Sequence, residues 1–215
     1  MKNFGIILSG CGVYDGSEIH EAVLTMLAIA QQECVYTIYA PDTDQMHVIN
    51  HITGEVMEEK RNVMVEAARI ARGEIKPLSE FDAAKTAGLI IPGGFGAAKN
   101  LCTYAVDGIN CKVNPEVEKA VIDMVALKKP VGGLCIAPVL LTRILKHIEV
   151  TIGQDEATAK DIGKLGGKNI FTNHGDVIID KQNNIFTTPC YMLDSTIAQV
   201  AEDIENLVKA MLNYM

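Results

Sequence analysis

The 215-residue chain has no tryptophan, and aromatic residues make up only 5% of it. Proteins that bind single-stranded nucleic acids stack the bases on aromatic side chains, so a base-stacking surface is not expected. The net charge of −8 also repels phosphate backbones and anionic membrane surfaces. We therefore expect neither nucleic acid nor a membrane among the partners of this protein.

Long apolar runs are absent as well. The apolar stretches are shorter than the ~20 residues that a membrane-spanning helix needs. The first residues, MKNFGIILSGCG, contain one lysine and a short apolar run without the small-residue cleavage site of a secretory signal. We interpret them as the first strand of the fold and expect a cytoplasmic protein.

The six cysteines do not form any of the usual metal-binding patterns. They stand at positions 11, 34, 102, 111, 135 and 190, with no C-x-x-C pair and no cysteine–histidine cluster. This spacing argues against a zinc site, and we expect no metal. A chain long enough to bury a full core does not need disulfide bonds, so reduced thiols are predicted.

Strand and helix patterns alternate along the chain, which is typical of an α/β protein. Helical spacing of apolar residues predicts a helix from about residue 19 to 30, capped by Ser17, and Asn114-Pro115 is typical of a helix start. The expected strands are 4–8, 35–39, 88–92, 130–134 and 149–152, with hairpins at 47–59 and 177–187. Further helices are expected at 62–72, 136–146, 156–165 and 191–213, and a long loop at 95–113.

These elements predict one domain over residues 1–215, with a mainly parallel sheet between two layers of helices and with hairpin insertions. In such sheets, ligands bind at the carboxyl ends of the strands. Two glycine-rich loops and a cysteine converge on that edge, namely SGCGVYDGSE, GGFGAAKN and Cys135. The loops lack the spacing of a P-loop or of a dinucleotide-binding motif, so no cofactor is expected.

Cys135 occupies the centre of Gly133-Leu134-Cys135-Ile136-Ala137. This is the small-x-nucleophile-x-small pattern of a nucleophile elbow, a strained turn from strand to helix. A helix N-terminus stabilises a thiolate there. Backbone N–H groups of Ile136 and of Gly93 or Gly94 would form an oxyanion hole. The alternative is that Cys135 packs as a small apolar side chain of the core.

Two other side chains are candidate partners of Cys135. Glu18 begins the first helix and either compensates the helix dipole or lies desolvated against Cys135, where its raised pKa would suit proton transfer. His174 belongs to a polar loop that either approaches the site or stays at the surface. His20 follows Glu18 by two residues and is expected to point away from that face of the helix.

Several stretches resemble the ElbB group of the PfpI-like, class I glutamine amidotransferase-like superfamily. They are SGCGVYDGSEIHEAVLT, VINHITGE, RNVMVEAARIARGEI, IPGGFGAAKNL, CIAP and TTPCYML. The resemblance implies a flavodoxin-like αβα sandwich, a site of Cys135 with Glu18, and glyoxalase activity without glutathione. In that reaction a small 2-oxoaldehyde such as methylglyoxal becomes a hydroxy acid. It also implies a link to isoprenoid biosynthesis.

The sequence departs from the wider superfamily, whose amidotransferases place a histidine beside the nucleophile. Ile136 follows the cysteine here, and TIGQD at 151–155 contains no histidine. Aldehyde chemistry by a cysteine and an acid is therefore favoured over amide hydrolysis. A redox sensor or regulatory binding protein built on Cys135 is the second hypothesis, and an amidotransferase subunit the third. A homodimer is expected.

Overall fold

A seven-stranded sheet forms the centre of the protein in a computed structural model that describes residues 1–215. Its strands stand in the order β3-β2-β1-β4-β5-β9-β8, and all neighbours are parallel except β8 and β9. The strands are β1 (Asn3–Ile7), β2 (Val35–Ala40), β3 (Lys76–Pro77), β4 (Gly88–Ile91), β5 (Val131–Leu134), β8 (Ile178–Asp180) and β9 (Ile185–Thr188). The predicted mainly parallel sheet is confirmed.

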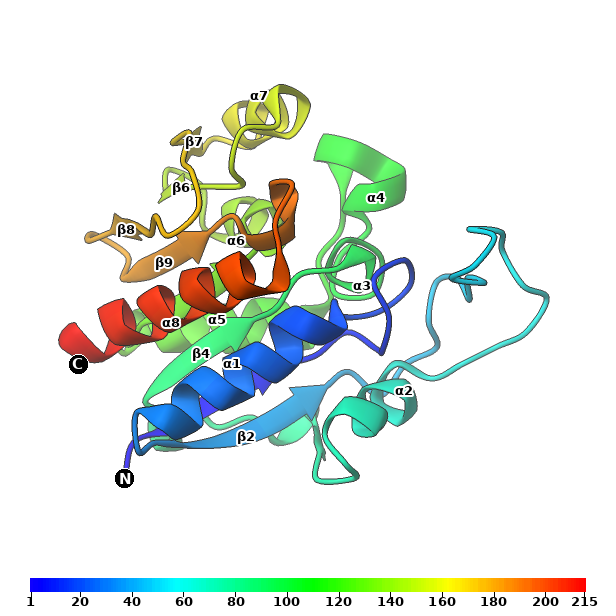
Figure 1. The fold of residues 1–215 in the computed structure, drawn as a ribbon, viewed down its shortest axis with the longest axis horizontal. Helices are drawn as coiled ribbons and strands as arrows, with labels where there is room; N and C mark the ends of the chain where they lie inside the picture. The colour runs from blue at the N-terminus through cyan, green and yellow to red at the C-terminus, as the bar shows by residue number, and fades with distance from the viewer.

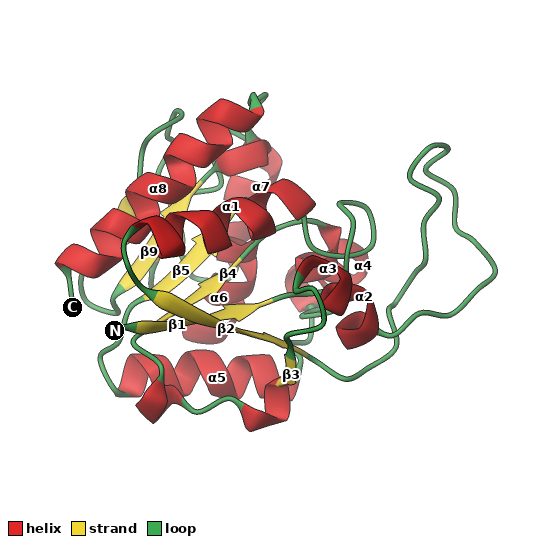
Figure 2. Ribbon diagram, turned by 60° about the horizontal axis from the view of Figure 1, so that its bottom comes forward, coloured by secondary structure: helices red, strands yellow, loops and turns green.

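Helices cover both faces of the sheet (Figures 1 and 2). One layer contains α1 (Ile19–Gln31), α2 (Val63–Ile70) and α8 (Ile197–Asn213), and the other contains α5 (Pro115–Ala126) and α6 (Ala137–Leu145). Because successive side chains of a strand point to opposite faces, Ile90 joins the first core while Leu89 and Ile91 join the second. The predicted three-layer αβα sandwich is therefore confirmed.

The segment after β4 differs from the prediction. In place of one long loop at 95–113, the chain forms α3 (Phe95–Lys99), α4 (Tyr104–Asp107) and a 3-10 turn at Gly108–Asn110. The glycines and the shortness of these helices hide them from a periodicity analysis, which needs about 11 residues. This correction matters because α3 and α4 form part of a cavity wall described below.

Two other elements also differ from the prediction. The last helix begins at Ile197 and not at 191, because Thr196 and Gln199 form a capping box there and Cys190–Met192 make a separate 3-10 turn. The predicted strand at 149–152 is β6 (Glu149–Val150), which pairs with β7 (Lys168–Asn169) in a separate small sheet. Helix α7 (Glu156–Lys164) follows β6 and precedes β7 in the chain.

The segment between β2 and α2 extends far from the body of the protein, as Figure 1 shows. The predicted hairpin at 47–59 is reduced to a single antiparallel bridge between Ile49 and Val56. Asp15 in the first loop holds this segment where it leaves the body of the protein, because the Asp15 Oδ2 accepts a hydrogen bond of 2.7 Å from the Ile49 N–H. None of the helices combines the length and the apolar character needed to cross a lipid bilayer.

Candidate active site

Cys135 stands at the turn between β5 and α6, where the backbone has a φ of 58°. A non-glycine residue in this left-handed region costs free energy and is common at functional sites. Gly133 makes room for the turn, because a Cβ atom there would lie 2.7 Å from Cδ1 of Leu141. The Cys135 N–H donates to the Thr188 carbonyl at 3.1 Å. The backbone thus has the elbow geometry that the sequence predicts.

Glu21 is the carboxyl group in direct contact with Cys135. Its side chain is fully buried and shares a hydrogen bond with the Cys135 thiol. Its two oxygens also accept backbone hydrogen bonds, Oε2 from Gly93 N–H at 2.8 Å and Oε1 from Tyr191 N–H at 3.4 Å. Glu21 therefore connects the first helix, the loop after β4 and the segment after β9 at the nucleophile.

Burial and the nearby Glu18 charge raise the pKa of Glu21 to about 8. Burial, followed by the Glu21 charge, also raises the pKa of the Cys135 thiol well above its ordinary value. The N–H groups of Gly94 and Ile136 oppose this by donating to the sulfur. A helix N-terminus alone would favour a thiolate, but here burial beside an acid outweighs it. The site therefore combines a thiol whose pKa is raised with a carboxyl group whose pKa is about 8.

Glu18 has a different place from the one expected. It is the N-cap of α1, and its Oε2 accepts a hydrogen bond of 2.7 Å from the Glu21 N–H. The cap is therefore Glu18 and not Ser17, whose Oγ instead accepts from the Ser9 N–H at 2.8 Å. Glu18 still lines the cavity onto which Cys135 opens. The two carboxylates have separate positions, with Glu21 at the sulfur and Glu18 on the cavity wall.

The N–H groups predicted as oxyanion donors also have two different partners. The N–H groups of Gly94 and Ile136 point to the Cys135 sulfur, whereas the N–H of Gly93 is bound to Glu21. No side chain fits at Gly93, because a Cβ atom would lie 2.5 Å from the Cys135 Cβ. The tight contact between these loops explains the glycine pair after β4.

A cavity of about 390 Å³ opens above Cys135, whose side chain is nearly buried but forms part of the wall. Most lining residues are apolar, and α3, α4 and the first loop contribute several of them. The polar groups of the wall are Glu18, Asp155, Thr158 and the two tyrosines 104 and 191. A small, uncharged organic molecule with one or two polar atoms suits this lining.

No histidine lines this cavity. His174 lies elsewhere, with its Nδ1 3.4 Å from the Ser195 Oγ. His20, which was expected to point away, reaches the site indirectly, since its Nδ1 lies 2.8 Å from the hydroxyl of Tyr191. Tyr191 is 171 positions further along the chain, so helical spacing within the first helix carried no signal of this contact.

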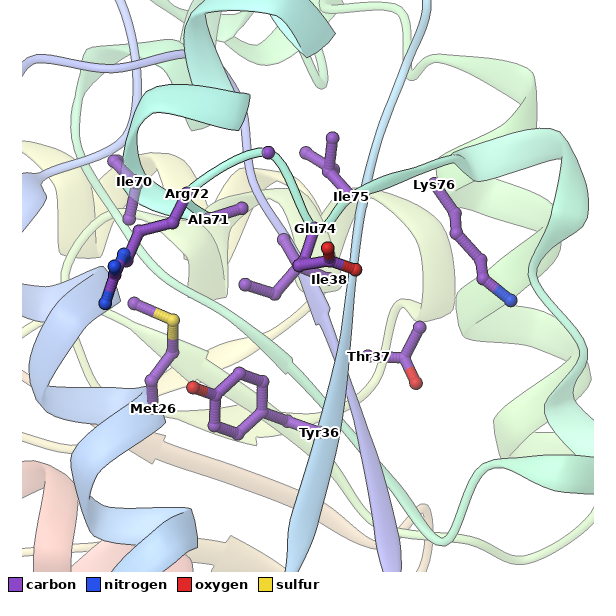
Figure 3. Close-up of a pocket in the computed structure, with 11 residues that line it drawn as sticks. Met26, Tyr36, Thr37, Ile38, Ile70, Ala71, Arg72, Glu74, Ile75 and Lys76 are labelled. Atoms are coloured by element: carbon purple, nitrogen blue, oxygen red, sulfur yellow. The ribbon is translucent and has the colours of Figure 1, made fainter.

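A larger hollow of about 760 Å³ lies between α2 and the strands β2 and β3 (Figure 3). Its wall contains no cysteine or histidine, and Figure 3 shows Arg72 and Lys76 on opposite sides of β2. Its charged groups do not converge on one point, so we place the candidate site at Cys135. No group of three or more histidine, cysteine or acidic side chains is arranged to hold a metal ion.

Known proteins match this sequence over nearly its whole length. No family model matches. The chain is 44% identical to the "ES1 protein homolog, mitochondrial" of Rattus norvegicus, over 96% of this chain and 82% of that protein. It is 43% identical to the human "Glutamine amidotransferase-like class 1 domain-containing protein 3, mitochondrial", over 96% of this chain and 81% of that protein.

Solved structures are also similar to this protein. An isoprenoid biosynthesis protein with an amidotransferase-like domain from Ehrlichia chaffeensis superposes with a TM-score of 0.93 at 35% identity, covering 100% of this chain and 99% of the other. A DJ-1 superfamily protein from Salmonella typhimurium gives a TM-score of 0.60 at 17% identity, covering 99% and 91%. The second match is evidence for a shared fold.

Proposed function

Because the chain belongs to the ElbB/ES1 family of the DJ-1/PfpI, class I glutamine amidotransferase-like superfamily, we propose that it is a cysteine-dependent glyoxalase. It would convert small 2-oxoaldehydes such as glyoxal and methylglyoxal to hydroxy acids without glutathione. One observation carries this proposal: the Cys135 thiol shares a hydrogen bond with the buried Glu21 and faces a mostly apolar cavity.

The first step is addition of the thiol to the aldehyde. The Glu21 carboxylate takes the thiol proton while the sulfur bonds to the aldehyde carbon, and the proton then passes to the aldehyde oxygen, so that the product is a hemithioacetal and Glu21 is a carboxylate again. A general base works best when its pKa is near the working pH, and the pKa of Glu21 is about 8. The N–H groups of Gly94 and Ile136 are the proposed donors to the developing negative charge.

The second step moves a hydrogen within the adduct. A proton leaves the former aldehyde carbon while the neighbouring carbonyl oxygen gains a proton, which gives an enediol. The base then returns its proton to the former carbonyl carbon, and the hydroxyl on the former aldehyde carbon gives its proton back to the proton donor, which leaves a thioester of a hydroxy acid. Glu18 faces the cavity with one carboxylate oxygen outside the helix cap, and it is the proposed base. The Tyr191 hydroxyl, bonded to His20, is the proposed proton donor to the carbonyl oxygen. Water then cleaves the thioester, releases the acid and restores the thiol.

The test is formation of lactate from methylglyoxal in glutathione-free buffer, followed by NMR. Cys135→Ser is expected to lose the activity. Cys34→Ser is the matched control, because Cys34 lies outside the cavity and a hydroxyl can keep its contact with the Gln32 carbonyl. Lactate formation by Cys135→Ser at the wild-type rate would exclude this mechanism.

A redox sensor is the second candidate function. The Gly94 and Ile136 N–H groups, together with a protonated Glu21, would also stabilise the oxygens of a sulfinic acid on Cys135. Peroxide titration followed by intact-mass analysis separates the two functions. Selective oxygen addition at Cys135 in a protein that produces no lactate favours the sensor.

The compartment, assembly and pathway are proposals as well. We propose a cytoplasmic homodimer with a link to isoprenoid biosynthesis, the process named for the Ehrlichia relative. The rat and human relatives are named mitochondrial. Cell fractionation therefore tests the compartment, and recovery in a mitochondrial fraction would contradict it. Light scattering on a gel-filtration column tests the dimer, and isoprenoid output of a deletion strain tests the pathway.

A further inference from the structure

Two further cysteines, Cys102 and Cys111, lie beside the wall of the cavity. An antiparallel β-bridge pairs the backbones of Cys102 and Val113. Two backbone hydrogen bonds of 2.9 Å flank it, from the Thr103 N–H to the Lys112 carbonyl and from the Asn114 N–H to the Leu101 carbonyl. This pairing places Cys111 diagonally across from Cys102 on the same side of the ladder. The Cys102 thiol lies next to Cys111 and donates to the Ala97 carbonyl at 3.4 Å, and both side chains are almost completely buried.

The two thiols have different surroundings. The neighbouring Cys102 thiol, together with the Arg143 guanidinium, lowers the pKa of Cys111 to about 7. The proximity of Cys111 and burial raise the pKa of Cys102. Arg143 also donates from its Nε to the Cys111 carbonyl at 3.0 Å, which holds its positive charge beside this residue. One reactive thiolate beside one resolving thiol is the arrangement found in redox-active cysteine pairs.

We propose that Cys102 and Cys111 form a reversible intramolecular disulfide when the protein meets a hydroperoxide. The Cys111 thiolate attacks the outer peroxide oxygen, which breaks the O–O bond, releases an alcohol or water and leaves a sulfenic acid. The Cys102 sulfur then displaces the hydroxyl of that sulfenic acid, and water leaves with the Cys102 proton. The two sulfurs together lose two electrons, and the peroxide gains them.

Oxidation would change the wall of the Cys135 cavity. The segment between the two cysteines contains α4, whose residues Tyr104 and Ala105 line that cavity. A disulfide would tie both ends of this segment together. The disulfide would thus form away from Cys135 but would change how easily a molecule enters the cavity at Cys135.

A peroxide reaches the buried sulfurs only when the segment opens. The Tyr104 hydroxyl donates to Asp161 on α7 at 3.0 Å and holds the segment against the body. Local opening of this kind limits reactions at buried groups. Tyr104→Phe removes the hydrogen bond and is expected to accelerate disulfide formation roughly five-fold, the factor that corresponds to about 1 kcal/mol.

The experiment treats the full chain with hydrogen peroxide, blocks free thiols with iodoacetamide and maps tryptic peptides without reduction. Both cysteines fall in one tryptic peptide, residues 100–112. The expected product is this peptide lighter by two hydrogens and without alkylation, restored by dithiothreitol. Cys102→Ala should stop at a Cys111 sulfenic acid that dimedone captures. Two alkylated cysteines after peroxide treatment that oxidises Cys135 would overturn the proposal, with no variant needed.

Discussion

The Cys135 thiol and the Glu21 carboxyl group are hydrogen-bonded at the base of the cavity, where Glu21 is fully buried and Cys135 nearly so. The Glu21 charge raises the pKa of the Cys135 thiol, because two negative charges in a buried site repel each other, whereas the thiol lowers the pKa of Glu21, which burial and the Glu18 charge raise. Only one of the two therefore ionises readily. This relationship makes the reactivity of the sulfur depend on the titration of a neighbouring acid.

Glu21 should make the protein less stable as the pH rises. Its pKa is about 8 in the folded protein against an ordinary value of 4.5, so between these values the folded state holds a proton that the unfolded state has lost. The stabilising effect of this proton is complete below pH 4.5 and is lost as the pH rises through 8. The free energy of unfolding should fall by up to about 1.4 kcal/mol per pH unit in this window.

Urea unfolding of wild type and Glu21→Gln between pH 5 and 9 measures this effect. The amide cannot ionise, so the variant should lose this contribution to the slope. Glu205→Gln is the control, because Glu205 belongs to an exposed ion pair with Lys209 and should keep the wild-type slope. Parallel curves for wild type and Glu21→Gln would contradict the assignment.

Removal of the Glu18 charge should change the reactivity of Cys135. Glu18 raises the pKa of Glu21, so Glu18→Gln is expected to lower that pKa while its amide oxygen still caps α1. The pH at which iodoacetamide alkylates Cys135 half-maximally should then move downward. Peptide mapping across a pH series gives this midpoint. An upward shift, or no shift, would show that the Glu18 charge does not affect the ionisation of Glu21 and Cys135.

Gly94 should be far less tolerant of a side chain than a glycine in open space. A Cβ atom at Gly94 would lie 2.4 Å from the Glu18 nitrogen, and its φ is 89°. Gly54→Ala is the matched control, because Gly54 has a φ of 78° and no atom within 4 Å of such a Cβ. We expect Gly94→Ala to cost about 4 kcal/mol and Gly54→Ala about 1–2 kcal/mol. Equal losses in urea unfolding would refute the claim of a close approach.

The sequence predicted the scaffold better than it predicted the contacts of the site. Alternating strand and helix patterns gave the sandwich, and the glycine-flanked Cys135 gave the elbow, because both are local patterns. Glu18 and Glu21 are three residues apart on one helix, so both face the same side. Which of them meets Cys135 depends on the start of α1, and that boundary is fixed by the Glu18 cap itself. The sequence pattern favours Ser17 as the cap, and nothing in it separates Glu21 from Glu18 as the partner of Cys135.

The hydroxyl of Tyr191 should matter for turnover and not for binding. Tyr191→Phe keeps the ring in the cavity wall and the backbone hydrogen bond to Glu21 but loses the contact with His20. If the hydroxyl delivers a proton in the proposed reaction, kcat for methylglyoxal should fall about 100-fold while KM stays nearly constant. Tyr214→Phe is the control, because Tyr214 lies outside the cavity wall and packs edge-to-face on Phe186. A purely structural role for Tyr191 predicts a rise in KM or a loss of stability in place of the selective fall in kcat, and either result would remove Tyr191 from the mechanism.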